Sequence, residues 1–344
     1  MTEKIGIQEL QELYEDPETP RSVLEDYLLA APEKSRPFAP GIVPDPAKVE
    51  TGISGSDTEV RAALVGDLVL AWERERRRRQ FEEDLVKRPD FKILYFEGDS
   101  WCQFPVFIEE LYDHLRKSFN IYCTSRAGDT ISNMLYKGPE YAKYLRELIH
   151  LRSLKLDGFV FSGAGNDVVG KGRSGKPALE ELLRNYDHSK PAAWHIETPE
   201  CDAIMEFIAN GYRRLLDSVE ERFSALAFPD LKIYLHGYDY VQVRSLPNGD
   251  PKRKPWAVNW TGDPLKARGF RDNSVGTAVI GALIDRLNET TRRVCSDYPQ
   301  RAVYVDLRGS VSANEWADEL HATSTGFQEA AKRFRKYLPA SVVS

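Results

Sequence analysis

The chain has 344 residues, which is longer than one typical domain and long enough to bury a large core. Its net charge of −6 argues against broad attraction to nucleic acid or to anionic membranes. No stretch of the sequence approaches about 18 consecutive apolar residues, so we expect no integral membrane association.

Targeting and redox signals both favour the cytoplasm. The N-terminal sequence MTEKIGIQELQELYEDPETP is acidic and lacks the apolar stretch of a Sec signal peptide. The four cysteines are far apart in the sequence, which favours reduced thiols over a disulfide framework: Cys102, Cys123, Cys201 and Cys295. We therefore expect a cytoplasmic protein, although export by a route that needs no signal peptide stays open.

The first 88 residues read as a helical N-terminal segment. Short helices are predicted over 1–30, an extended linker rich in Pro, Gly and Ser over 31–56, and one long helix over 57–86. One side of the long helix is apolar and must be buried on the rest of the chain, on a partner protein or on a second copy: Leu64, Val65, Leu68, Val69 and Trp72. The basic run from Arg74 to Arg79 has acidic residues at helical spacing, which predicts a solvated helix face.

Residues 89–344 alternate between apolar runs and helical patterns. Strands are predicted near 91–97, 119–124, 156–162, 231–236 and 302–307, and helices near 105–117, 138–150, 200–227, 273–294 and 323–337. Five strands alternating with helices indicate an α/β domain with a parallel sheet covered on both faces. The stretches 168–199 and 241–270 leave the carboxyl ends of two strands, so they should border the functional cleft.

A serine stands where the first of these strands turns towards the next predicted helix. Gly98-Asp99-Ser100 follows the apolar run, and the helix is expected to open near Phe104. A hydroxyl at this edge of a parallel sheet is well placed for catalysis, and N–H groups that open a helix favour developing negative charge. On its own the tripeptide is weak evidence, because turns favour all three residue types.

The other end of the chain supplies a base for this serine. Asp318 and His321 lie three residues apart just before the last predicted helix, and both can face one cleft. A serine hydroxyl needs a base at neutral pH, and a carboxylate can fix the tautomer of that imidazole. Between these ends, Gly128 and Asn166 follow predicted strands and could donate hydrogen bonds to an oxyanion.

Serine, glycine, asparagine and histidine in this order, each in its own loop, resemble the SGNH (GDSL-type) hydrolase family over about residues 90–338. The resemblance implies a three-layer α/β/α, flavodoxin-like fold with strand order 2-1-3-4-5. It implies Ser100 as nucleophile, His321 as base and Asp318 as its orienting acid. The oxyanion hole would comprise the N–H groups of Ser100 and Gly128 and the Asn166 amide. The third motif usually reads Gly-x-Asn-Asp, but here Ala164 holds the first position.

The implied activity is hydrolysis of a small-molecule carboxylic ester through an acyl-enzyme, with short acyl chains favoured. A lipase, phospholipase or thioesterase on the same fold is an alternative, and so is a non-catalytic binding module that uses residues 1–88 as a docking arm. Trp101, Tyr238 and Asp239 are expected to bind the substrate, because they lie at the functional edge of the sheet.

No cofactor and no metal are expected, because the histidines and cysteines lack the spacing of metal ligands. The run from Gly165 to Gly172 imitates a phosphate-binding loop. However, Gly172 stands where the magnesium-binding Ser or Thr should be, which argues against a nucleotide site.

Overall fold

Five apolar strands form one parallel sheet in the computed structural model, which describes residues 4–35, 39–50, 58–172, 174–224, 228–250 and 254–340. The strands are β5 (Ile93–Gly98), β6 (Asn120–Cys123), β7 (Leu156–Ser162), β8 (Lys232–His236) and β9 (Ala302–Val305). Their order across the sheet is β6-β5-β7-β8-β9, and every neighbouring pair is parallel. This is the order 2-1-3-4-5, so the expected sheet is confirmed.

The two central strands are apolar because both of their faces are covered. Leu94, Tyr95 and Phe96 in β5 are fully buried, and so are Phe159 and Val160 in β7. Burying each large apolar side chain contributes about 1.5–3 kcal/mol, so these runs hold the sheet at the centre of the core.

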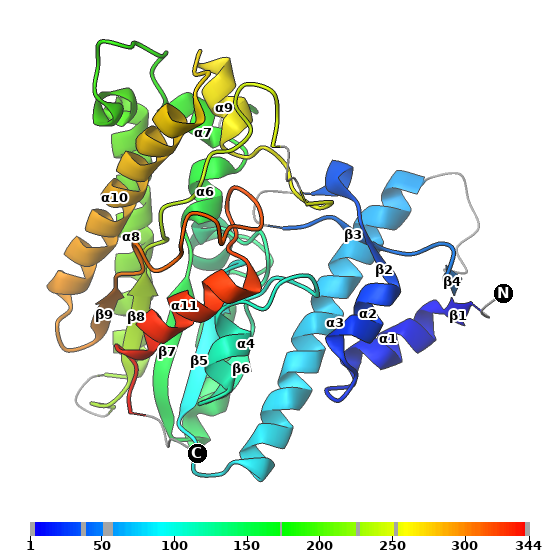
Figure 1. Ribbon diagram of the computed structural model, residues 1–344. Helices are drawn as coiled ribbons and strands as arrows, with labels where there is room; N and C mark the ends of the chain where they lie inside the picture. Colours follow the sequence, from blue (N-terminus) through cyan, green and yellow to red (C-terminus); the bar gives the residue numbers. More distant parts are fainter. Residues whose placement is uncertain are drawn as a thin grey trace.

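Helices cover the two faces of the sheet (Figure 1). α4 (Leu111–Arg116) packs against α11 (Ser324–Arg335), whereas α8 (Pro199–Arg222) packs against α10 (Asn273–Asp297). Thr198 caps α8 by accepting a hydrogen bond from the Cys201 N–H, and Asp272 caps α10 in the same way. The shorter elements are α5 (Lys143–His150), α6 (Gly165–Val169), α7 (Ala178–Leu182), α9 (Gly262–Ala267), η1 (Pro32–Lys34), η2 (Ser132–Tyr136), η3 (Leu151–Ser153) and η4 (Ala192–Ile196).

The helix expected over 105–117 begins later than predicted. Val106 has a left-handed backbone with φ of 64°, which a helix does not allow. Glu110 then caps α4, because its side chain accepts the Tyr112 N–H while Asp113 accepts the Glu110 N–H. The prediction that a helix opens near Phe104 is therefore wrong.

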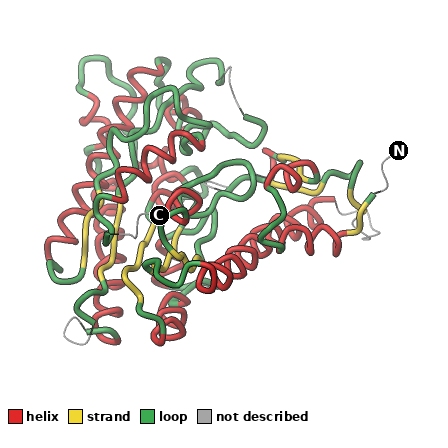
Figure 2. Tube along the Cα trace, turned by 60° about the horizontal axis from the view of Figure 1, so that its bottom comes forward, coloured by secondary structure: helices red, strands yellow, loops and turns green. Residues whose placement is uncertain are grey.

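The N-terminal segment contains strands as well as helices, and it lies at one edge of the molecule (Figure 2). Its elements are β1 (Ile5–Gly6), α1 (Ile7–Glu15), α2 (Arg21–Asp26), β2 (Leu28–Ala30), β3 (Ile42–Pro44), β4 (Val49–Glu50) and α3 (Thr58–Lys87). β1 pairs with β4 and β2 pairs with β3, so two short parts of the expected extended linker, Ile42–Pro44 and Val49–Glu50, are strands of small sheets. Linker residues 36–38 and 51–56 lie outside the described residues.

The apolar side of α3 is covered by this segment. Val69 and Trp72 are buried in a small core with Leu10 and Tyr14 of α1 and Leu24 of α2. Leu68, which was expected on the same buried side, is 41% exposed, so the prediction is wrong for this residue. The side chains of the remaining predicted positions, Leu64 and Val65, lie outside the described residues. The proposed protein partner or self-association through 57–86 stays a prediction.

The basic run on α3 is not simply a solvated face. Arg77 is only 1% exposed. Its guanidinium donates to Glu73 at 2.7 Å, to the Cys102 carbonyl at 2.6 Å and to Glu110. The helix spacing alone predicts pairs such as Arg78 with Glu75, but it does not predict that one arginine turns inward and meets the loop after Ser100.

Trp72→Ala is expected to lower the free energy of unfolding by about 3–5 kcal/mol, because it empties the centre of the small core. Leu68→Ala, one turn away, is the matched control, since Leu68 is 41% exposed and should cost less than about 1 kcal/mol. Urea unfolding of both variants measures the difference. Equal values would mean that the small core adds little to the stability of the chain.

Within the described residues, no helix combines the length and the apolar character needed to cross a bilayer.

Candidate active site

Ser100 lies just beyond the carboxyl end of β5, two residues after a glycine that the backbone requires. Gly98 has φ of 144°, and a Cβ there would lie 2.1 Å from the Ser162 carbonyl oxygen. The chain then makes one turn, because the N–H groups of Cys102 and Gln103 both donate to the Asp99 carbonyl. We call residues 98–103 the nucleophile loop.

The structure brings Ser100, His321 and Asp318 into one hydrogen-bonded chain. Ser100 Oγ lies 2.8 Å from His321 Nε2, although 221 residues separate them. His321 Nδ1 lies 3.0 and 2.9 Å from the two oxygens of Asp318. All three side chains are buried, so the chain of contacts is shielded from water.

Asp318 is held as an anion by its surroundings. Burial alone would raise its pKa, but the neighbouring His321 and the N–H groups of Leu320 and His321 outweigh burial and lower it. Those two N–H groups lie 2.7 and 2.8 Å from Oδ1. A carboxylate that stays ionised can orient an imidazole and stabilise its cation.

Gly128 and Asn166 line a common cleft of about 860 Å³. Gly128 has φ of 80°, a conformation that favours glycine. Asn166 Nδ2 donates one N–H to the Asp129 carbonyl at 2.6 Å, which fixes the amide beside Gly128. A side-chain amide has two N–H groups, so this contact uses only one of them, and an oxyanion donor needs one.

The loop before Asn166 departs from the family motif at a position where the backbone favours glycine. Ala164 has φ of 89°, and it is fully buried. A left-handed conformation costs an alanine about 1–2 kcal/mol, so the surroundings must hold it. Asp167 links this loop to the Gly128 loop, because its carboxyl accepts the Ile131 N–H at 2.9 Å. Burial raises the pKa of Asp167 to about 7, against the effect of that hydrogen bond.

Two of the expected substrate-binding residues have structural partners instead. Trp101 is fully buried, and its indole N–H points to the Leu320 carbonyl at 3.3 Å. The Asp239 carboxylate accepts the N–H groups of Gly309 at 2.5 Å and Val311 at 2.7 Å, so it holds the loop after β9. A position at the functional edge of the sheet does not decide whether a side chain points into the cleft or into the framework.

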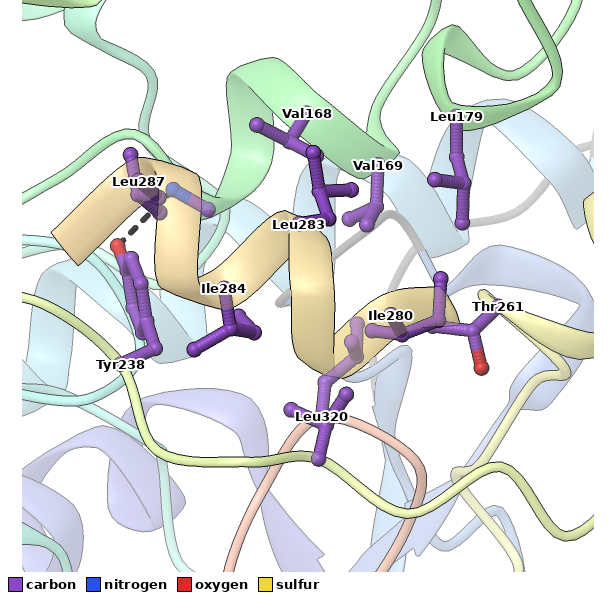
Figure 3. Close-up of a pocket in the computed structure, with 12 residues that line it drawn as sticks. Val168, Val169, Leu179, Tyr238, Thr261, Ile280, Leu283, Ile284, Leu287 and Leu320 are labelled. Atoms are coloured by element: carbon purple, nitrogen blue, oxygen red, sulfur yellow. Dashed lines mark hydrogen bonds between the residues drawn. The ribbon is translucent and has the colours of Figure 1, made fainter. Parts of the chain in front are cut away.

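Tyr238, the third of these residues, lines an apolar cavity of about 30 Å³ (Figure 3). Its hydroxyl donates to Asp99 and accepts the Gly165 N–H at 3.0 Å. The hydroxyl that was expected to bind substrate is thus bonded to two loops of the site.

The sequence pattern missed Gln103. Its Oε1 accepts the Ala127 N–H at 2.9 Å, and its Nε2 lies 3.5 Å from the Leu70 carbonyl of α3. The amide therefore ties the nucleophile loop to the residue before Gly128. A buried glutamine in a turn carries no sequence signal for this role, since its partners are set by the fold.

Aromatic side chains cover the histidine. The Phe104 ring lies 4.6 Å from the His321 ring, and Trp256 stacks on Phe107 at 4.9 Å beside it. Trp256 belongs to the stretch 241–270 that was expected to border the site. Among the described residues no group of His, Cys, Asp and Glu could hold a metal ion.

No family model and no curated protein matches the sequence. Among solved structures, an extracellular lipase from Streptomyces rimosus is 13% identical, with a TM-score of 0.41, and the match covers 72% of this chain and 99% of that one. An aryl esterase from M. smegmatis is 14% identical, with a TM-score of 0.39, over 72% of this chain and 100% of that one. A carbohydrate acetylesterase from Sinorhizobium meliloti is 12% identical, with a TM-score of 0.37, over 71% and 97%.

All three TM-scores are below 0.5, so these similarities do not support an assignment. The fold is assigned from the strand order, and the site is described from the distances between its residues. In the order of its motifs and of its strands, the chain resembles the SGNH (GDSL-type) hydrolases.

Proposed function

We propose that the protein is a serine esterase that hydrolyses carboxylic esters through an acyl-enzyme. The observation that carries this proposal is the buried chain from Ser100 Oγ through His321 to Asp318, with contacts of 2.8 and 2.9 Å. A nucleophile, a base and an orienting carboxylate in this arrangement meet the geometric requirements of acyl transfer.

In the first half of the reaction, His321 Nε2 takes the proton of Ser100 as Oγ attacks the ester carbonyl. Asp318 stabilises the imidazolium that forms, and His321 then gives the proton to the leaving alcohol. In the second half, water attacks the acyl-enzyme with His321 again as base, which releases the acid and restores Ser100.

The negative charge on the carbonyl oxygen needs donors in both halves. The N–H groups of Ser100 and Gly128 and the second N–H of Asn166 are the proposed donors. The shared cleft of Gly128 and Asn166 supports this assignment, and so does the Gln103 bridge between the nucleophile loop and Ala127, the residue before Gly128.

The acyl group is proposed to be short. Ser100 and His321 are 0% and 2% exposed, and Phe104 packs against the histidine, which favours a small ester. A second candidate, a lipase or thioesterase that takes longer chains, is favoured by the apolar Leu182, Ile204 and Phe207 in the cleft beside Asn166.

A fluorophosphonate probe tests the proposal, since it should label the native protein at Ser100, as read by mass spectrometry of the labelled peptide. A p-nitrophenyl ester series from acetate to palmitate then separates the two candidates. Turnover that is highest at two to four carbons supports the short-chain esterase, whereas a maximum beyond about eight carbons supports the second candidate. Without labelling or turnover, the binding-module alternative holds.

Asn166→Ala is expected to lower kcat about 10²–10³-fold with a smaller effect on KM, because an oxyanion donor acts mainly in the transition state. Steady-state kinetics on p-nitrophenyl acetate measures it. Asn210→Ala, on the exposed face of α8, is the control and should leave kcat unchanged. An unchanged kcat in Asn166→Ala would show that the amide faces away from the oxyanion.

A further inference from the structure

Residues 163–166, which end in the first turn of α6, are held between two buried tyrosines. We call these residues the Asn166 loop. Tyr212 donates to the Gly163 carbonyl at 3.0 Å, and Tyr238 accepts the Gly165 N–H at 3.0 Å. Between these two contacts lies Ala164, whose left-handed backbone is unfavourable for an alanine. Hydrogen bonds on both sides explain how the loop keeps a shape for which its sequence is poorly suited.

Tyr238 is the contact that also reaches the nucleophile loop. The same hydroxyl that accepts the Gly165 N–H donates to Asp99, the residue before Ser100. Asp99 is fully buried, and its other oxygen accepts the Ser162 hydroxyl at 2.7 Å and the Trp101 N–H at 3.1 Å. Figure 3 shows the ring of Tyr238 beside α10, and the dashed line from its hydroxyl marks the hydrogen bond with Gly165, the first residue of α6.

The hydroxyl of Tyr238 stays protonated in this environment. Burial raises the pKa of its phenol well above the ordinary value, and the charge of Asp99 raises it further. The hydroxyl therefore remains a donor to Asp99 across the working pH range, and its oxygen remains an acceptor for Gly165.

An oxyanion hole whose donors come from three loops requires those loops to keep fixed positions relative to one another. Gln103 joins the nucleophile loop to the Gly128 loop, and Asn166 joins its own loop to the Gly128 loop through the Asp129 carbonyl. Tyr238 supplies the third connection, between the nucleophile loop and the Asn166 loop. A displacement of one donor by about 1 Å can cost about 10²-fold in rate, so each connection matters to catalysis.

We propose that Tyr238 is a positioning residue, which holds Asn166 at the oxyanion by bridging Asp99 and Gly165. The inference rests on the proposed esterase function. It assigns Tyr238 a role in the framework of the oxyanion hole, in place of the direct contact with substrate that its sequence position suggested.

The first test is Tyr238→Phe, which removes only the hydroxyl. We expect kcat on p-nitrophenyl acetate to fall about 10- to 100-fold, with KM changed less than about threefold. Tyr144→Phe is the matched control, since Tyr144 of α5 is similarly buried and loses a hydrogen bond to Ser218 of α8, neither of which belongs to the loops of the site. Its kcat should match the native value even if its melting temperature falls. A loss confined to KM, or an equal loss of kcat in Tyr144→Phe, would overturn the proposal.

The second test is a double-mutant cycle with Asn166→Ala. If Tyr238 acts through Asn166, Tyr238→Phe should cost less than about threefold when Asn166 is already absent. Ser162→Ala is the comparison, because it weakens the support of Asp99 without touching Gly165, and its cost should be the same in both backgrounds. An undiminished cost of Tyr238→Phe in the Asn166→Ala protein would refute the assignment, and so would the loss of the Ser162→Ala effect in that protein.

These outcomes are separate from a failure of the proposed function. An inactive, unlabelled native protein contradicts the esterase assignment. An active native protein whose Tyr238→Phe variant is equally active contradicts only the role of Tyr238.

Discussion

Ser100→Ala is expected to lose about 10⁶-fold in kcat and to lose all labelling by a fluorophosphonate probe. Removing the nucleophile of a serine triad costs about as much as removing the whole triad, because the three groups act as a unit. The loss should fall on kcat, since the hydroxyl forms its bond only as the reaction proceeds. Burst-corrected kinetics on p-nitrophenyl acetate and mass spectrometry of the labelled protein are the two measurements.

The fold should survive this change, because within the described residues the Ser100 hydroxyl forms one hydrogen bond, at 2.8 Å to His321. Loss of a single hydrogen bond costs about 0.5–1.5 kcal/mol, so the melting temperature should change little. Ser218→Ala, which loses a hydroxyl on α8 far from the site, is the control and should keep full activity. Labelling that persists in Ser100→Ala would assign the nucleophile to another residue.

The five strands could be predicted because their signals are strong and local, whereas their order was implied by the resemblance to the SGNH hydrolases. The apolar runs at β5 and β7 are continuous, as expected for strands buried on both faces, and the helices between them enforce a parallel sheet. The start of α4 could not be predicted in the same way. Apolar spacing over 105–117 suggested a helix, but Val106 adopts a left-handed backbone and Glu110 supplies a cap with a better hydrogen-bond pattern.

Candidate catalytic residues could be predicted from the sequence because a nucleophile and a base each require a particular residue type in a particular loop. Ser100 follows the carboxyl end of β5, whereas His321 lies in the loop between β9 and α11, and the structure brings the two side chains within 2.8 Å. The supporting residues were not visible, because their partners are decided by tertiary contacts. Tyr238 reaches residues 73 and 139 positions away, and Gln103 reaches one 24 positions away.

In the N-terminal segment, too, the sequence pattern did not predict the tertiary contacts of a single residue. The helical spacing of α3 predicted ion pairs on its surface, and such pairs exist between Arg78 and Glu75. Spacing carries no information about which turn of a helix meets the core. Arg77 is therefore the unexpected residue: it is buried, and it donates to the Cys102 carbonyl two residues after Ser100.

Asp318→Asn is expected to lower kcat about 10⁴-fold while the loop keeps its shape. Asp318 Oδ1 accepts the backbone N–H groups of Leu320 and His321, so the oxygen of an asparagine would stay there. The new NH₂ group would then face His321 Nδ1, which must become an acceptor. The imidazole proton would move to Nε2, and that nitrogen could no longer take the proton of Ser100.

Two further variants distinguish a tautomer defect in His321 from a loss of structure. Asp217→Asn, on the exposed face of α8 where the side chain accepts the Tyr298 hydroxyl, is the matched control and should keep full kcat. Asp318→Ala should be no more active than Asp318→Asn if the charge and the orientation of His321 are what matter. The measurement is kcat on p-nitrophenyl acetate at pH 7 to 8, together with the melting temperature of each variant. An Asp318→Asn protein that keeps more than about a tenth of the native kcat would mean that His321 needs no anion at Nδ1, and the proposed triad would reduce to a serine and a histidine.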